Sequence, residues 1–329
     1  MSGILAIFLL ALAVTAVSIP WVRRLALRTG FVDTPSQRKL HSTPMPLLGG
    51  LAIFAGAFVA LVFFANETPK TVAGVFLSFT LVMLIGLADD RYHLPARVKL
   101  LGELTAVCIL IYFGIHVRLP LPYIVNYAIT ALWLIGITNA INFLDNMDGL
   151  SAGISGVAAS FMLLLGLENG QFLVAGLSAA VLGACLGFLR YNFPPAKIFM
   201  GDVGALFLGF TLAILGLQLR FPANQATVTW MVPIFILAVP IFDTTLAVIS
   251  RLRRGLSPNT AGKDHISHRL VRLGFSQREA VLILYLLTGA TGMIALYITQ
   301  ADLVQAYILA VICSLIALYI MWWLEKKWQ

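Results

Sequence analysis

The sequence predicts an all-α integral membrane protein with about eleven transmembrane helices. Apolar residues make up 60% of the 329 residues and charged residues only 11%, and the mean hydropathy is +0.93. Apolar runs recur along the whole chain, most of them close to the roughly 20 residues that a helix needs to cross the hydrocarbon core. Basic residues gather in alternate loops. We therefore expect one transmembrane domain over residues 1–329, and the composition excludes a soluble globular protein.

The helices follow from the apolar runs in chain order. The first run lacks both a charged segment before it and a small-residue cleavage site, so we expect a retained helix rather than a signal peptide. The three cysteines all lie within apolar runs and show no pairing or metal spacing, which favours a buried apolar role. The expected helices lie near residues 4–22, 47–65, 72–88, 101–117, 120–138, 150–167, 171–189, 202–218, 230–249, 280–298 and 303–323.

The basic residues predict the orientation of these helices. Cytoplasmic loops of membrane proteins carry an excess of lysine and arginine. If the loops after the odd-numbered helices are cytoplasmic, only Lys70, Arg118 and Arg220 of the 22 basic residues lie on the other side. We therefore expect the N-terminus outside and the C-terminus in the cytoplasm.

Acidic residues lie where apolar runs meet these cytoplasmic loops. Asp89 and Asp90 end the third run, Asp145 and Asp148 follow the fifth, and Asp202 begins the eighth. Orientation and anionic lipid headgroups account for basic loops but not for acids within them. Carboxylates gathered at a membrane surface indicate a hard divalent cation held against a phosphate. The loops expected to form the active site lie near 23–46, 89–100, 139–149, 190–202 and 250–279.

Two adjacent aspartates at the C-terminal end of a helix repel each other and face the unfavourable end of its dipole. A bound cation would neutralise Asp89 and Asp90. The alternative is that Arg91, Arg97 and Lys99 pair with them as surface salt bridges, which contribute only about 0–1 kcal/mol each.

The segment 139–149 carries the strongest polar pattern. Asn142 and Asp145 would lie with Asn139, Asn146 and Asp148 on one face of a helix. Amides at membrane depth are costly unless partners, water or a ligand satisfy them. Hydrogen bonds between helices would explain one or two of these residues but not all five.

The fourth cytoplasmic loop places Asp202 at the start of a helix. An aspartate there is a common N-cap, which is a strong structural alternative. The glycines beside it also permit close approach of a ligand. Asn192 and Phe199 offer an amide and an aromatic face that could contact a base.

Cationic groups mark the first and last cytoplasmic loops. His41 lies in a compact basic group of the first loop, for which a purely topogenic role is equally plausible. His265 and His268 lie three residues apart near Arg269. Surrounding cations disfavour zinc, so we interpret this loop as a phosphate-facing patch. Asp243 lies within an apolar run, where a carboxylate is a functional candidate.

Five ordered motifs resemble the polyprenyl-phosphate N-acetylhexosamine-1-phosphate transferases (glycosyltransferase 4 family), and the resemblance covers nearly the whole chain. The motifs are HSTPMPLLGG, LADDRYHLPARVKL, NAINFLDNMDGLSAG, RYNFPPAKIFMGDVGALFLG and DHISHRL. Such enzymes transfer a sugar 1-phosphate from a UDP-sugar to a polyprenyl phosphate and release UMP. The resemblance thus implies Mg²⁺ (or Mn²⁺) as cofactor, UDP-sugar and polyprenyl phosphate as partners, no nucleic acid, and a possible homodimer.

The resemblance also implies individual roles. Asp202 matches the metal-ligating aspartate, and Asp89 and Asp90 match the adjacent acids beside the metal and the diphosphate. The other matched positions are Asn142 and Asp145 at the active site, Asp148 near the nucleotide, Asn192 and Phe199 at the uridine, His265 and His268 in the histidine motif, and Lys99 at the phosphates. We add His41, Arg269 and Asp243 as candidates for substrate binding.

The last motif, H-I-S-H, resembles the H-x-H-H of the WecA/TagO-type enzymes, with Ser267 replacing one histidine. It therefore favours UDP-GlcNAc and undecaprenyl phosphate in a cell-envelope glycan pathway. Another UDP-N-acetylhexosamine, or less readily UDP-MurNAc-pentapeptide, is the alternative. A cation-coupled transporter is the competing class, but its ion sites would lie near the bilayer midplane in repeated halves.

Overall fold

The computed structural model describes residues 2–33, 44–63, 69–260 and 262–328, and the side chains of 59–63, 69–71 and 328 are not described. The chain divides into two compact units, Met1–Leu219 and Arg220–Gln329, here the N-terminal and C-terminal units. The prediction of a single transmembrane domain stays a prediction.

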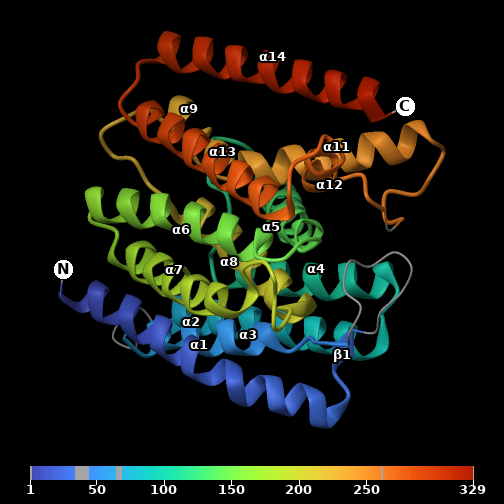
Figure 1. Cartoon of the computed structure of the whole chain (residues 1–329). Helices are drawn as coiled ribbons and strands as arrows, with labels where there is room; N and C mark the ends of the chain where they lie inside the picture. The colour runs from blue at the N-terminus through green and yellow to red at the C-terminus, as the bar shows by residue number, and fades with distance from the viewer. Residues whose placement is uncertain (1, 34–43, 64–68, 261, 329) are drawn as a thin grey trace. The chain divides into compact units, whose positions relative to one another are not determined.

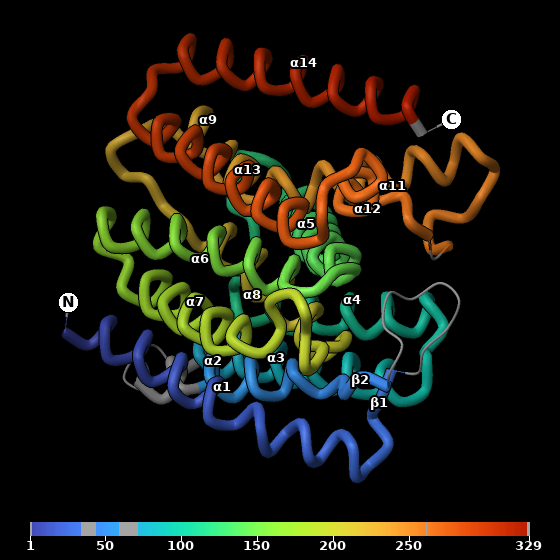
Figure 2. The backbone as a smooth tube through the Cα atoms, viewed as in Figure 1, coloured from blue at the N-terminus to red at the C-terminus, as the bar shows by residue number. Residues whose placement is uncertain are grey.

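In the described residues of the N-terminal unit, the structure has eight helices and one pair of short strands (Figure 1). The strands β1 (Val32–Asp33) and β2 (Met45–Pro46) are antiparallel (Figure 2). The helices are α1 (Ser2–Thr29), α2 (Gly49–Phe63), α3 (Pro69–Tyr92), α4 (Ala96–Tyr112), α5 (Tyr123–Leu144), α6 (Leu150–Glu168), α7 (Phe172–Asn192) and α8 (Gly201–Gln218).

The described part of the C-terminal unit has six helices, three of which are short. A capping box formed by Ser276 and Glu279 starts the long helix α13, and the Asn224 amide donates to carbonyls at its other end. The helices are α9 (Ala226–Thr229), α10 (Val232–Ile236), α11 (Ala238–Arg253), α12 (Ile266–Arg272), α13 (Gln277–Ile298) and α14 (Leu303–Trp328).

The chain is an all-α multi-pass membrane protein, as predicted. Among the described residues, eight helices are long and apolar enough to cross a bilayer, and the pair Ala226–Ile236 and Ala238–Arg253, bent by 69°, would make a ninth span. Each of the eleven apolar runs coincides with one of these spans or with the shorter helices α2 and α4. The predicted number of eleven spans stays a prediction, because these two helices are shorter than the usual spanning length.

Helix α8 forms the centre of the N-terminal unit. Among the candidate spans, α8 has the largest share of buried residues: 83% of its most apolar stretch is buried, against 22% for α1. It packs against α2, α3 and α5, and α1 runs along α2 and α7 (Figure 1). The exposed apolar side chains of outer helices such as α1 suit contact with lipid, which is as apolar as they are.

Two glycines allow α2 and α3 to reach the backbone of α8. A Cβ added at Gly50 would lie 2.1 Å from the amide nitrogen of Gly204. A Cβ at Gly86 would lie 2.6 Å from Cα of Val203 and 2.7 Å from the carbonyl oxygen of Asp202. Small residues permit this close packing of helices in membranes. The start of α8 is therefore fixed by backbone contact on two sides.

We expect Gly86→Ala to destabilise the protein by about 1–3 kcal/mol, because the added methyl group meets backbone that cannot turn away. Thermal unfolding in detergent tests this. Gly136→Ala on α5 is the control, because no atom lies within 4 Å of its added Cβ. Equal effects of the two changes would contradict the proposed packing.

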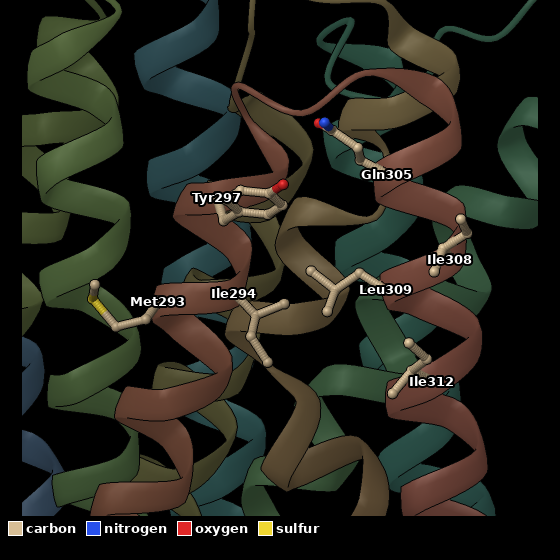
Figure 3. A pocket seen from close by; sticks show the side chains of 7 residues that line it. All are labelled: Met293, Ile294, Tyr297, Gln305, Ile308, Leu309 and Ile312. Carbon is tan, nitrogen blue, oxygen red and sulfur yellow. The ribbon is translucent and has the colours of Figure 1, made fainter.

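An apolar cleft separates α13 from α14 in the C-terminal unit (Figure 3). Its volume is about 580 Å³, and its polar groups come from Tyr297 and Gln305. Helix α14 is only 6% buried, so lipid or another apolar chain must cover most of its surface. The cleft is lined by Met293, Ile294, Tyr297, Gln305, Ile308, Leu309 and Ile312.

Candidate active site

The ends of four helices bring carboxylates together in the N-terminal unit. The ammonium group of Lys99, in the first turn of α4, lies 2.6 Å from Oδ2 of Asp89 and 2.5 Å from Oδ2 of Asp202. The side-chain amide of Asn142, near the end of α5, donates to Oδ1 of Asp202 at 3.1 Å. We call Asp89, Asp90, Lys99, Asn142 and Asp202 the carboxylate cluster. The structure thus joins residues that are up to 113 positions apart.

The two adjacent aspartates of α3 have different partners. Asp89 accepts from the backbone N–H of Leu94 at 2.7 Å and pairs with Lys99. Asp90 accepts from the backbone N–H of Asp202 at 2.8 Å and from that of Val203 at 3.3 Å. Asp90 therefore caps the N-terminus of α8 from a neighbouring helix, where the dipole favours a negative charge. Asp89 is left as the aspartate that pairs with a cationic side chain.

Gly201 makes the capping by Asp90 possible. Its φ is +67°, a left-handed conformation that L side chains rarely adopt. A Cβ at this position would also lie 2.4 Å from Oδ2 of Asp90. The glycine beside the predicted metal-binding aspartate is thus required by the turn and by the cap.

A second group of bonds joins the loop after α5 to the loop before α8. Asn192, 3% exposed, accepts from the backbone N–H of Gly149 at 2.9 Å and donates to the carbonyl of Ile198 at 2.9 Å. Asp148 accepts from the backbone N–H of Ala196 at 2.8 Å. Both ends of the Asn192 amide are therefore occupied by the protein. Asn192 thus braces the two loops, and its predicted contact with uridine stays a prediction.

Phe199 lies in the same loop, beside the first of the loops that the sequence predicts to be cytoplasmic. Its backbone N–H donates to the carbonyl of Pro46 at 2.8 Å, and its carbonyl accepts from the N–H of Gly49 at 3.0 Å. This short extended pairing ties the first predicted loop to the start of α8. His41, also predicted as a substrate contact, lies outside the described residues.

Asp145 ends α5 in an environment that disfavours its charge. Its burial raises its pKa well above the usual value, and the negative charges of Asp202, Asp90 and Asp148 raise it further. Such a carboxyl group keeps its proton to a higher pH than an ordinary aspartate does, as catalytic carboxyl groups often do. Its predicted catalytic role stays a prediction.

We expect Asp145→Asn to stabilise the protein at neutral pH by about 2–4 °C in the unfolding midpoint while lowering turnover. Because the folded-state pKa is raised, stability is greatest below the ordinary pKa and falls as pH rises towards the raised value. The advantage of the variant should therefore disappear below about pH 4. Unfolding curves at several pH values test this, and a less stable variant at pH 7 would contradict it.

Glu103 is a buried acid near the cluster that the sequence analysis did not select. It is 1% exposed on α4, one turn after Lys99, and its Oε2 accepts from the side-chain amide of Asn139 on α5 at 2.6 Å. Its other oxygen has no hydrogen-bond partner among the described residues. Glu103 and Lys99 are four residues apart, which places them on the same face of a helix. This spacing is the signal in the sequence that could have identified Glu103.

The carboxylate cluster fits a magnesium ion bound together with a substrate. No group of three or more His, Cys, Asp or Glu side chains with metal-binding geometry occurs in the described part of the chain. Mg²⁺, however, is commonly held by one or two carboxylates plus substrate phosphates and water. Asp89 and Asp202, which both pair with Lys99, supply two such carboxylates. Both oxygens of Asp90 accept backbone N–H groups of α8, whereas Asp89 and Asp202 each direct Oδ2 at a cationic side chain, so Asp89 and Asp202 suit the metal better.

The histidine motif of the C-terminal unit starts α12 and is held by buried charges. Nδ1 of His265 lies 2.7 Å from Oδ2 of Asp243, and Oδ1 of Asp243 accepts from the backbone N–H of Ile266 at 2.7 Å. Nε2 of His265 lies 3.1 Å from Nη2 of Arg251, and Nε of Arg251 donates to Asp264 at 3.0 Å. Asp243, Arg251, Asp264 and His265 are all buried. We call these four residues the histidine cluster.

Arg269 and His268 lie on the same short helix but in different surroundings. Arg269 is 2% exposed, and it donates to Glu325 of α14 at 2.6 Å and to the carbonyl of Asp264 at 2.8 Å. This buried ion pair fixes α12, and the predicted substrate contact of Arg269 stays a prediction. His268 is half-buried, and burial, with positive charge from Lys263 among other causes, lowers its pKa to about 4. His268 is therefore neutral at pH 7.

Comparison with known proteins adds the chemical class. A family model described as glycosyl transferase family 4 matches residues 72–220. The chain is 37% identical to a probable undecaprenyl-phosphate N-acetylglucosaminyl 1-phosphate transferase of Bacillus subtilis, over 92% of this chain and 87% of that protein. It is 34% identical to the decaprenyl-phosphate N-acetylglucosaminephosphotransferase of Mycolicibacterium smegmatis, over 85% and 78%. It is 26% identical to the undecaprenyl-phosphate alpha-N-acetylglucosaminyl 1-phosphate transferase of Escherichia coli, over 94% and 88%.

Proposed function

We propose a reaction for this chain from the premise that it belongs to glycosyl transferase family 4, among the polyprenyl-phosphate N-acetylglucosamine-1-phosphate transferases. The chain transfers N-acetylglucosamine 1-phosphate from UDP-GlcNAc to a polyprenyl phosphate. The acceptor phosphate forms a bond to the β-phosphorus, the bond to the α-phosphate breaks, and UMP leaves. The observation that carries this proposal is the Lys99 ammonium between Asp89 and Asp202, a charge arrangement suited to a diphosphate and its cation.

The proposed location is the cytoplasmic face of a bacterial plasma membrane. Eleven spanning helices, with the N-terminus outside, would put the carboxylate cluster on the same side as the basic loops. A UDP-sugar is a water-soluble cytoplasmic substrate, and a polyprenyl phosphate carries its charge at headgroup depth. A reaction site at helix ends suits both substrates.

The proposed cofactor is Mg²⁺, held by Asp89 and Asp202. Bound there with the diphosphate, it would supply charge neutralisation to the phosphoryl group in transfer. The chain's own residues complete the arrangement. Lys99 adds a positive charge beside both carboxylates, and Asn142 fixes the orientation of Asp202 through Oδ1. Phosphoryl transfer needs this positioning more than it needs covalent help.

We propose that the acceptor attacks in one step. The second pKa of a phosphomonoester is about 6, so the lipid phosphate is mostly dianionic at pH 7 and needs little help from a base. Asp90 is engaged in capping α8, which leaves Asp89 as the member of the pair that could position the acceptor. A phosphorylated aspartate trapped with UDP-GlcNAc in the absence of lipid would overturn the one-step proposal.

N-acetylglucosamine is the proposed sugar because the relatives named above carry it in their names. Ser267 stands where the related motif has a histidine, but it is fully buried on α12. This replacement therefore does not by itself indicate a different sugar. UDP-GalNAc and UDP-MurNAc-pentapeptide are the alternatives that the assay must compare.

The test is incubation of membranes containing the protein with radiolabelled UDP-GlcNAc, undecaprenyl phosphate and Mg²⁺. We expect a labelled lipid product and an equal amount of UMP, with much less product from UDP-GalNAc or UDP-MurNAc-pentapeptide. EDTA should stop the reaction, and excess Mg²⁺ should restore it. Membranes without the protein are the control. Absence of both lipid product and UMP would refute the transferase and leave the transporter as the remaining class.

A further inference from the structure

The buried histidine of α12 has both ring nitrogens in contact with charged partners, and these partners determine where its proton lies. A guanidinium group has no acceptor, so Nη2 of Arg251 can only donate to Nε2 of His265. Nε2 must therefore be unprotonated. The proton lies on Nδ1, where it is donated to Oδ2 of Asp243. The two contacts, of 3.1 Å and 2.7 Å, select the same neutral tautomer.

The same three residues also anchor the helix that carries His268. Oδ1 of Asp243 caps the first N–H of α12, and Arg251 donates to Asp264 and to the carbonyl of Pro258. The chain on both sides of His265 is thus fixed to α11. His268 lies three residues further on α12, with its ring centroid 6.4 Å from that of His265.

We infer that Asp243, His265 and Arg251 form a positioning triad that holds His265 as the neutral Nδ1–H tautomer, so that of the two histidines only His268 serves the substrate phosphates. This inference deepens the proposed function and rests on it for the role of His268. His268 is half-buried rather than enclosed, and the described residues give its ring no hydrogen-bond partner. A phosphate is the chemical group that a neutral imidazole N–H in a basic loop would bind. His265 is then a positioning residue, not a catalytic one.

The tautomer can be measured without any assay of activity. Full-length protein in detergent, labelled with ¹⁵N-histidine, gives one pair of ring nitrogen signals for each of its five histidines. His265→Gln identifies the pair that belongs to His265. We expect a protonated Nδ1 and an unprotonated Nε2 at pH 7. An imidazolium, or a proton on Nε2, would overturn the inference, and this result stands even if the proposed reaction fails.

A double-mutant cycle tests the coupling within the triad. In Asp243→Asn the amide N–H would point at Nδ1 of His265. The ring proton would then have to move to Nε2, where it would face the N–H of Arg251. We expect turnover to fall about a hundredfold in this variant. In an Arg251→Met background the same change should cost at most about tenfold, because the opposing donor is gone. The inference would be overturned if Asp243→Asn lowered turnover by the same factor with and without Arg251→Met, and if the tautomer of His265 were unchanged in Asp243→Asn.

Conservative replacements separate positioning from catalysis. Asn at position 265 can still donate to Asp243 from a nitrogen near the place of Nδ1, whereas Ala cannot. We expect His265→Asn to retain at least about ten times the turnover of His265→Ala, with similar KM for UDP-GlcNAc in both. His268→Asn and His268→Ala should be equally impaired. A His265→Asn variant as inactive as His265→Ala, but equally stable to heat, would instead assign His265 to the chemistry.

Discussion

Asp202→Asn should lower turnover by roughly a thousandfold while the protein remains folded. The asparagine keeps the size of the side chain but loses the charge that faces Lys99, and its amide N–H would meet the ammonium donor. The backbone N–H of residue 202 keeps its cap from Asp90, so the start of α8 should not move. Turnover is measured as UMP release from UDP-GlcNAc with undecaprenyl phosphate, at several Mg²⁺ concentrations.

Glu168→Gln is the matched control for this change. It removes the same charge from the exposed C-terminal end of α6, outside the carboxylate cluster. We expect its turnover and thermal unfolding to equal those of the wild type. Near-normal activity of Asp202→Asn would refute its role in the site. A large fall in its unfolding temperature would show that the lost activity reflects a lost fold.

The fold was largely predictable because apolar length is the main requirement for crossing a membrane. Each apolar run coincides with a helix in the described residues. The bend of 69° before Ala238 was not predicted, since the run 230–249 is continuously apolar. The helix α12 was not predicted either. It has only seven residues, and it depends on a cap from Asp243, which is 23 positions away from Ile266.

The candidate site was predictable as a set of residues but not as a set of contacts. Acids at helix ends stood out because nothing about orientation requires them there. The sequence could not distinguish the roles of Asp89 and Asp90. They are adjacent aspartates in the same motif and differ only in the direction of their side chains. Asn192 and Arg269 illustrate the same limit of sequence patterns. Only packing shows that their polar atoms bind other parts of the chain.

The different roles of Asp89 and Asp90 lead to the second large expected effect. Asp89→Asn should lower turnover about a hundredfold, with a smaller loss of stability than Asp90→Asn. Its amide oxygen can still accept from Leu94, and its amide N–H would face only the side chain of Lys99, beside which one charge is lost. It should also raise the Mg²⁺ concentration needed for half-maximal activity.

Asp90→Asn should act in a different way, because its carboxylate bonds to the backbone of α8. An asparagine can accept from the N–H of Asp202, but its own N–H group would then face the N–H of Val203. We expect a loss of about 1–3 kcal/mol in the free energy of unfolding and a fall in turnover, with the Mg²⁺ requirement unchanged. Unfolding curves and Mg²⁺ titrations of both variants distinguish the roles. A raised Mg²⁺ requirement in Asp90→Asn, without loss of stability, would reverse the two assignments, since a residue that only holds the helix cannot alter the affinity for the cation alone.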